Sequence, residues 1–274
     1  MYIDFHTHIF PDKIANAAIS ELSQRCGCAP FSDGTLNGLI NSMKNGNVDL
    51  SVVLPVVTNP KQFDSVNRFA QSINNTAGIV SFGGIHPDCE DPEEKLNYIK
   101  EIGLRGIKIH PDYQKTFIDD PKFVRIISHC IKIGLYVVTH SGVDVGYPDP
   151  VHCTPDRILN LLSLLPSYEE PRLILAHTGA YGMWDEVEQK LVGKNVYFDL
   201  AYSLDKISEE QLMRIISNHG SEKILFATDS PWSGQKEFTE IFDSLPLNEQ
   251  DRENISYKNA LKILSLESLK ALKR

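Results

Sequence analysis

The sequence lacks long apolar runs, an excess of positive charge and a regular cysteine framework. No uninterrupted apolar stretch approaches the ~18 residues that suggest a membrane-spanning helix, so we expect no membrane insertion. The formal net charge of −9 argues against a broad surface for nucleic acid or anionic lipid. The 5 cysteines are an odd number without regular spacing, which is typical of free thiols in a reducing compartment.

The N-terminal residues lack the features of a secretory leader. A strand-like segment begins at residue 2, which leaves no room for a basic region followed by an apolar one. We therefore expect a cytoplasmic location. With 42% apolar and 23% charged residues, the composition is ordinary for a globular protein that buries a large core.

Short apolar, β-branched runs recur along the chain between helix-length segments. They predict eight strands, at residues 2–8, 50–56, 79–85, 104–110, 135–140, 172–177, 196–202 and 224–229. Three of the intervening helices have clear start signals, in which a capping residue is followed by proline: Asp91-Pro92, Asp120-Pro121 and Thr154-Pro155. Gly103 and Gly134 are expected to end the first two of these helices.

Eight parallel-type strands alternating with helices fit either an open doubly wound sheet or a closed barrel. No G-x-G-x-x-G turn follows the first strand, so a dinucleotide-binding open sheet lacks support. The strand count favours an α/β fold of the (β/α)8 TIM-barrel type, formed by residues 1–274 as a single domain. The segments "NISYKNALKILSL" and "SLKALKR" predict extra C-terminal helices that cover the barrel wall.

The histidines collect where the predicted strands end. Only His129 and His219 of the 9 histidines fall in helical stretches. Catalytic groups of barrels stand at the C-terminal strand ends, because the strand bodies fill the apolar interior. The polar residues found at or just after these ends are His6, His8, His86, Lys108, His110, His140, His152, His177 and Asp229.

A metal ion accounts best for several imidazoles and a carboxylate converging at one barrel mouth. His6 and His8 share one face of their strand, since side chains alternate with a period of two. Together with His140 and Asp229 they offer the nitrogen and oxygen ligands typical of Zn2+, while Mn2+, Fe2+ or Co2+ would also be tolerated. Taken singly, a strand-end histidine such as His86 or His110 is more often a hydrogen-bonded structural residue.

These residues resemble the amidohydrolase superfamily of metal-dependent (β/α)8 barrels. The resemblance covers nearly the whole chain: the H-x-H of His6 and His8, then His140, His177 and Asp229 at the ends of strands five, six and eight. The phrases "GGIHPD", "GIKIHPDYQ", "LILAHTGA" and "ATDSPW" look most like the amidohydrolase-related branch that includes aminocarboxymuconate semialdehyde decarboxylase. A phosphoesterase family that opens with a similar H-x-H fits less well, because Asp229 is not followed two residues later by histidine.

The resemblance implies roles for the site residues. His6, His8, His140 and Asp229 would hold a zinc ion, Asp229 would also transfer protons, and His177 would be an acid/base or a ligand of a second ion. Lys108 occupies the strand-four position at which two-metal members carry a carboxylated lysine, so one ion or two remain open. In the mouth, Lys108 could instead pair with an acid or bind a substrate carboxylate.

Three functions compete. The leading expectation is a hydrolase in which metal-activated water attacks a small amide, ester or lactone. The alternative is a metal-dependent decarboxylase or hydratase, and a barrel that keeps a metal only for structure or binding is the third. The expected partner is a small-molecule substrate contacted by His86, His110, Tyr113 and Trp232, and a homodimer is compatible with the sequence.

Overall fold

The computed structural model describes residues 1–147 and 149–266. The predicted helix in "SLKALKR" lies outside these residues, as its first residue is Ser268. The contacts of the chain group it into two compact units. The first comprises Met1–Val53, Asn75–Val80 and the chain from Asp199 onward, and the second comprises Leu54–Asn74 and Ser81–Phe198. The prediction of one domain over residues 1–274 stays a prediction.

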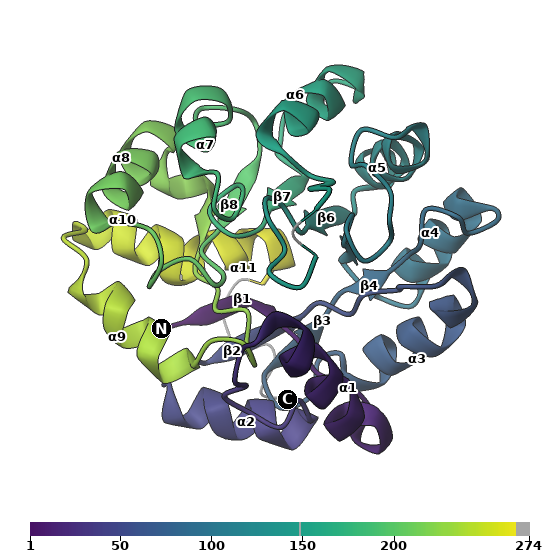
Figure 1. Ribbon diagram of the computed structural model, residues 1–274, viewed down its shortest axis with the longest axis horizontal. Helices are drawn as coiled ribbons and strands as arrows, with labels where there is room; N and C mark the ends of the chain where they lie inside the picture. Colours follow the sequence, from purple (N-terminus) through teal and green to yellow (C-terminus); the bar gives the residue numbers. More distant parts are fainter. Residues whose placement is uncertain (148, 267–274) are drawn as a thin grey trace. The chain divides into compact units, whose positions relative to one another are not determined.

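The first unit is built on parallel strands around β1 (Ile3–Thr7). β1 pairs with β2 (Leu50–Val53), and β3 (Ile79–Ser81) follows β2 in the same sheet (Figure 1). On the other edge of β1, the Phe5 amide donates to the carbonyl of Phe226 at 2.9 Å, and Thr7 forms a parallel bridge with Ser230. The segment that follows β9 (Ile224–Leu225) therefore lies beside β1.

The second unit contains five consecutive parallel strands, except that the last residue of the fifth, Asp199, belongs to the first unit. β4 (Gly83–Gly84), β5 (Gly106–Ile109), β6 (Tyr136–Thr139), β7 (Leu173–Leu175) and β8 (Tyr197–Asp199) are neighbours in that order (Figure 1). Every residue of these strands is buried. Burial on both faces explains why the strands are mostly apolar and do not alternate with polar residues, although β5 includes Lys108 and β8 includes Asp199.

Helices alternate with the strands, as the sequence predicts. Those of the first unit are α1 (Asp12–Cys26), α2 (Leu36–Asn45), α8 (Glu209–His219), α9 (Gln235–Ser244), α10 (Glu249–Glu253), a π-helical turn (Asn254–Lys258) and α11 (Asn259–Leu264). Those of the second are α3 (Phe63–Ile73), α4 (Pro92–Glu101), α5 (Pro121–Ile133), α6 (Pro155–Leu164) and α7 (Trp184–Lys190). Short 3-10 turns cover Pro60–Gln62 and Ser221–Lys223. Within the described residues, no helix combines the length and apolar character needed to cross a bilayer.

Two of the three predicted helix caps are confirmed. The Asp120 side chain accepts from the Lys122 amide, and the Thr154 side chain accepts from the Arg157 amide. The cap predicted at Asp91 is wrong, because its backbone is left-handed (φ 49°) and its side chain makes no cap hydrogen bond. α4 still begins at Pro92, whose fixed φ suits the first helical position.

The third predicted strand is divided into β3 and β4 at Phe82. The Asn67 side chain replaces a neighbouring strand here: its Nδ2 donates to the Gly84 carbonyl at 2.9 Å, and its Oδ1 accepts from the Gly84 amide at 3.0 Å. A Cβ on Gly83 would lie 2.5 Å from Asn67 Oδ1, so glycine is required beside this side chain. A pattern of apolar residues in the sequence cannot predict that a side chain will take the hydrogen bonds of a neighbouring strand.

Candidate metal centre and histidine cluster

His6, His8 and Asp229 come together in the first unit. His6 lies on β1, His8 follows its end, and Asp229 stands beyond β9. The backbone brings them together, because the Asp229 amide donates to the His6 carbonyl at 2.8 Å and the His8 amide donates to the Ser230 carbonyl at 2.6 Å. All three residues, which the sequence analysis placed together, belong to the first unit and lie close to one another.

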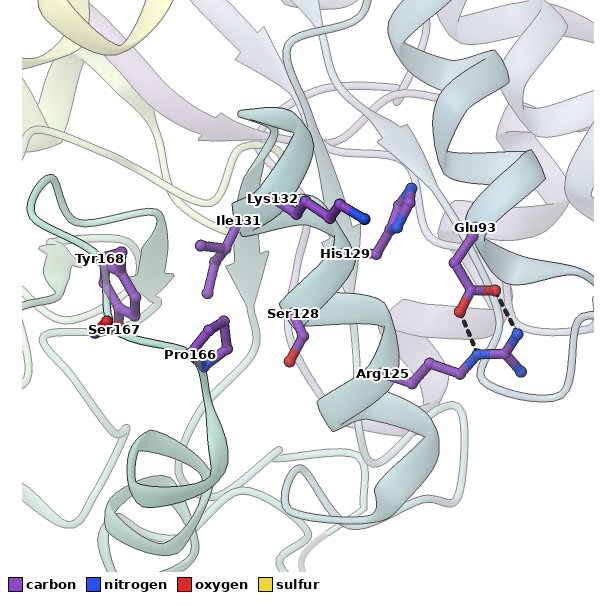
Figure 2. A pocket seen from close by; sticks show the side chains of 9 residues that line it. All are labelled: Glu93, Arg125, Ser128, His129, Ile131, Lys132, Pro166, Ser167 and Tyr168. Atoms are coloured by element: carbon purple, nitrogen blue, oxygen red, sulfur yellow. Dashed lines mark hydrogen bonds and ion pairs between the residues drawn. The ribbon is translucent and has the colours of Figure 1, made fainter.

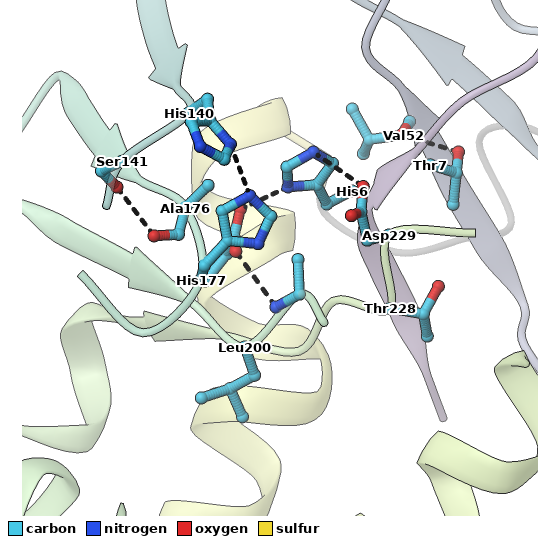
Figure 3. A network of polar contacts seen from close by, with 12 residues as sticks. His6, Thr7, Val52, His140, Ser141, Ala176, His177, Leu200, Thr228 and Asp229 are labelled. Carbon is cyan, nitrogen blue, oxygen red and sulfur yellow. Dashed lines mark hydrogen bonds and ion pairs between the residues drawn. The ribbon is translucent and has the colours of Figure 1, made fainter. Parts of the chain in front are cut away.

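The three side chains point their donor atoms at one another. His6 Nε2 lies 3.1 Å from His8 Nε2 and 3.4 Å from Asp229 Oδ1, and His8 Nε2 lies 3.1 Å from the same oxygen. Figure 3 shows the His6–Asp229 contact. His6 is fully buried, whereas the His8 side chain keeps 17% of its surface exposed. The group is therefore anchored in the interior and open on the side of His8.

These distances match a shared divalent cation. Ligand atoms bound at ~2.1 Å to one ion are separated by roughly 3.0 to 3.4 Å when neighbouring ligands stand at octahedral or tetrahedral angles. The three observed separations fall in that range. Two imidazole nitrogens and one carboxylate oxygen are also a donor set suited to zinc, manganese or iron. The residues present therefore fit the predicted ion.

Asp199 orients His6 from behind. Its Oδ2 lies 2.8 Å from His6 Nδ1, and the Asp199 side chain is wholly buried. A carboxylate at Nδ1 keeps the proton there, which leaves the Nε2 lone pair for a ligand on the opposite side of the ring. The sequence analysis missed this residue. The available signal was a single carboxylate within the otherwise apolar predicted strand 196–202.

Asp4 lies beneath the same group, on β1. Burial raises the pKa of its carboxyl to about 7, and hydrogen bonds from Thr228 and Gln235 oppose that rise. The side chain is fully buried and accepts from Thr228 Oγ1 at 2.6 Å and from Gln235 Nε2 at 2.7 Å. A buried acid with several donors is a strongly constrained part of the unit.

His140 and His177 form a pair in the second unit. Nδ1 of His140 and Nε2 of His177 lie 3.0 Å apart (Figure 3). Within the described residues, the buried His140 Nε2 has no hydrogen-bond partner. Burial, with the nearby His110 and His177 rings, lowers the pKa of His140 well below its usual value. A neutral His140 that donates through Nδ1 would keep an unshared electron pair on Nε2, as a metal ligand requires.

His110 belongs to the same unit and is packed between two rings. The Tyr113 ring stacks on it at 3.7 Å between centroids, and the His140 ring stacks at 4.2 Å. Its Nε2 lies 3.3 Å from Asp144 Oδ2. His110, His140 and Asp144 form a second group whose possible ligand atoms all lie within 4.8 Å. Asp144 was not among the predicted site residues.

The remaining predicted residues have varied surroundings. Lys108 is buried on β5, and Trp232 is partly buried after β9. His86 is buried, its Nδ1 accepts from the Asp88 amide at 3.1 Å, and burial lowers its pKa.

The four ligands predicted for a single ion, His6, His8, Asp229 and His140, do not all belong to one unit. The participation of His140, His177 and Lys108 therefore stays a prediction.

Asp112 and His152 connect two loops of the second unit, and the sequence analysis did not pair them. Asp112 Oδ1 accepts from the His152 amide at 3.0 Å and lies 2.9 Å from its Nδ1. Asp112 Oδ2 lies 3.8 Å from His140 Nε2, too far for a hydrogen bond. The bond from the Ile118 amide to the His152 carbonyl, at 3.0 Å, joins the same loops. This pair stabilises the loop that follows His140.

A separate cavity of about 700 Å³ lies along α5 (Figure 2). One side of the cavity is lined by Arg125, His129 and Lys132, and the other by Pro166 to Tyr168. Arg125 forms an ion pair with Glu93. None of its lining residues is a predicted site residue. The chemistry predicted from the sequence is therefore not located in this cavity.

Comparison with known proteins establishes the family. A family model described as Amidohydrolase matches residues 3–266. The chain belongs to the amidohydrolase family. Its similarity extends to a 2-amino-3-carboxymuconate-6-semialdehyde decarboxylase of Dictyostelium discoideum, which is 24% identical over 338 residues covering 98% of this chain and 93% of that protein. The resemblance drawn from the strand-end motifs is confirmed.

Several other proteins with solved structures have a similar fold. One is an uncharacterised TIM-barrel protein, Bb4693, from Bordetella bronchiseptica. It has a TM-score of 0.74 at 16% identity, covering 96% of this chain and 98% of the other. A dihydroxybenzoic acid decarboxylase from Polaromonas sp. JS666, with bound manganese and the inhibitor 2-nitroresorcinol, has a TM-score of 0.69 at 14% identity, covering 97% of each chain. The predicted TIM-barrel fold class is confirmed.

Proposed function

We propose that this amidohydrolase is a metal-dependent decarboxylase of a small conjugated carboxylic acid. The observation that carries the metal dependence is the triangle of donor atoms formed by His6, His8 and Asp229, at separations of 3.1 to 3.4 Å. The Dictyostelium and Polaromonas relatives are both named decarboxylases, which favours the second expected activity over hydrolysis. The donor triangle itself is compatible with both reactions.

His6, His8 and Asp229 would hold one divalent cation, and the family resemblance adds His140 as a further ligand. When bound, such a cation supplies a Lewis acid that polarises a substrate oxygen. Zinc was the expected metal, and the manganese in the Polaromonas enzyme makes Mn2+ an equal candidate. The nitrogen and carboxylate donors accommodate both metals, so the choice between them falls to metal analysis.

Decarboxylation needs a proton donor and a means of stabilising the electron pair that the departing carboxyl group leaves on the substrate. The bond between the substrate carbon and its carboxyl group breaks, its electron pair stays on the substrate, and a proton takes the place of the released carbon dioxide. His177 is the proposed donor, because histidine is the side chain best suited to proton transfer near neutral pH and the family resemblance gives this residue an acid/base role. Lys108 is proposed to bind a substrate carboxylate through its buried ammonium group.

The test is a product assay on the purified protein after its metal content has been measured. The metal-loaded protein is incubated with 2-amino-3-carboxymuconate-6-semialdehyde and 2,6-dihydroxybenzoate, and with a matched panel of esters, lactones and amides. We expect carbon dioxide release from an acid without net addition of water. Asp229→Ala should abolish this release, whereas His129→Gln, in the α5 cavity, should retain it. Hydrolysis of a panel member without carbon dioxide release would support the hydrolase instead.

The predicted homodimer is part of the proposal and has its own test. Analytical ultracentrifugation of the metal-loaded protein should give about twice the 30.8 kDa mass of the chain. A mass of one chain at the concentrations used for assay would remove the dimer from the proposal.

A further inference from the structure

Asp4 accepts hydrogen bonds from several parts of the first unit at once. Its Oδ1 accepts from the Thr228 amide at 2.9 Å and from the His6 amide at 3.3 Å. Its Oδ2 accepts from Thr228 Oγ1 at 2.6 Å and from Gln235 Nε2 at 2.7 Å. Asp4, Thr228 and Gln235 are each fully buried, so no solvent competes with these bonds. A carboxylate with this many buried donors is a fixed point of the structure.

Thr228 extends the influence of Asp4 across Asp229. Its hydroxyl donates to Asp4 and accepts from the Ser230 amide at 3.0 Å. Asp4 is therefore bonded directly to the residue before Asp229 and, through one hydroxyl, to the residue after it. We call Asp4, Thr228 and the Ser230 amide the Asp4 clamp.

The backbone of Asp229 needs such support. Its φ is 69°, in the left-handed region that residues with a Cβ rarely adopt. A residue keeps this conformation only when its surroundings determine it. In a more extended conformation the carboxylate would leave the triangle that it forms with His6 and His8. The clamp fixes both neighbours of the strained residue.

The orientation of the Gln235 side-chain amide is separate evidence that hydrogen bonds to Asp4 determine the local structure. Within the described residues, its buried Oε1 has no hydrogen-bond partner, while its Nε2 donates to Asp4 and to Ser51 Oγ at 3.0 Å. Turning the amide over would place Oε1 against the Asp4 carboxylate, where two acceptors repel. The protein leaves one buried oxygen unsatisfied and keeps the donor on Asp4.

We infer that Asp4 is a positioning residue that holds Asp229 in the left-handed, cation-binding conformation through Thr228 and the Ser230 amide. The inference rests on the proposed cation at His6, His8 and Asp229. Asp4 itself needs no contact with substrate or metal, because its effect passes through the backbone on both sides of Asp229.

Thr228→Val and Thr7→Val form a matched pair of test variants. Both remove a fully buried hydroxyl from the same unit. Among the described residues, Thr7 Oγ1 donates to the Val52 carbonyl at 2.9 Å (Figure 3), whereas Thr228 belongs to the clamp. Mn2+ affinity is measured by calorimetric titration well below the melting temperature. We expect Thr228→Val and Asp4→Asn to bind Mn2+ at least about tenfold more weakly than Thr7→Val.

Crystal structures of the metal-free Thr228→Val and Thr7→Val proteins provide a second readout that needs no cation. Asp229 should leave the left-handed region in the first variant and keep it in the second. An unchanged φ with Mn2+ affinity equal to that of Thr7→Val would overturn the inference. If the unaltered protein binds no divalent cation, the proposed function fails, while the two values of φ still decide whether the clamp holds Asp229.

Discussion

His6 Nδ1 lies 2.8 Å from Asp199 Oδ2, and both side chains are buried. This contact assigns the proton of the ring to Nδ1 and turns the Nε2 lone pair toward His8 and Asp229. A second carboxylate behind a metal-binding histidine both fixes the ring and raises its basicity. The Asp199–His6 contact is therefore as much a part of the candidate centre as the three donor atoms.

Asp199→Asn should weaken Mn2+ binding by roughly 10- to 100-fold while the protein remains folded. Asparagine has nearly the shape of aspartate, but it lacks the charge that keeps the Nδ1 proton in place. The measurement is a calorimetric titration of metal-free protein, with circular dichroism to show that the fold is retained. Affinity equal to that of the unaltered protein would mean that Asp199 only fills space behind His6.

Removing a ligand should also remove the stabilisation that a cation provides. A ligand that binds only the folded state at 100 times its Kd adds about 2.7 kcal/mol to the free energy of unfolding. We expect this gain on addition of Mn2+ to the unaltered protein, and none for His8→Ala or Asp229→Ala. Thermal unfolding with and without a chelator measures it. A full gain in both variants would place the binding site elsewhere.

The sequence predicted the strands, and the shared orientation of His6 and His8, because both follow local rules. Buried parallel strands are continuous apolar runs, and H-x-H at a strand end puts His6 and His8 on one side. Asp199 and Asp144 were missed because their roles depend on partners that are distant in sequence. For the same reason the pattern could not show Asn67 standing in for a strand beside Gly84.

Two glycines with similar backbones should respond differently to substitution by alanine. Gly142, in the loop after His140, has φ 84°, and an added Cβ would lie 2.1 Å from the Tyr181 amide nitrogen. Gly134 has φ 82° with nothing within 4 Å of that position. Gly134→Ala should cost about 1 to 2 kcal/mol for the left-handed backbone alone, and Gly142→Ala should cost more because the loop must also move.

Denaturant unfolding of the two alanine variants checks this difference. The parallel bridge between Gly142 and Tyr181 would open in the Gly142 variant, so the His140 loop should also become more susceptible to proteolysis. Equal losses of stability in both variants would show that the Tyr181 segment moves aside freely.

The pH dependence of stability should reflect His86. Burial lowers its pKa, and its Nδ1 accepts from the Asp88 amide, which only the unprotonated nitrogen can do. Below about pH 6.5 the unfolded chain binds a proton at this histidine that the folded protein resists, so the free energy of unfolding falls as the pH decreases. Above that pH both states are neutral and the contribution is constant. In the presence of a chelator, urea unfolding between pH 7.5 and 5 should show a shallower decline for His86→Gln than for the unaltered protein. Parallel curves would mean that His86 titrates alike in both states.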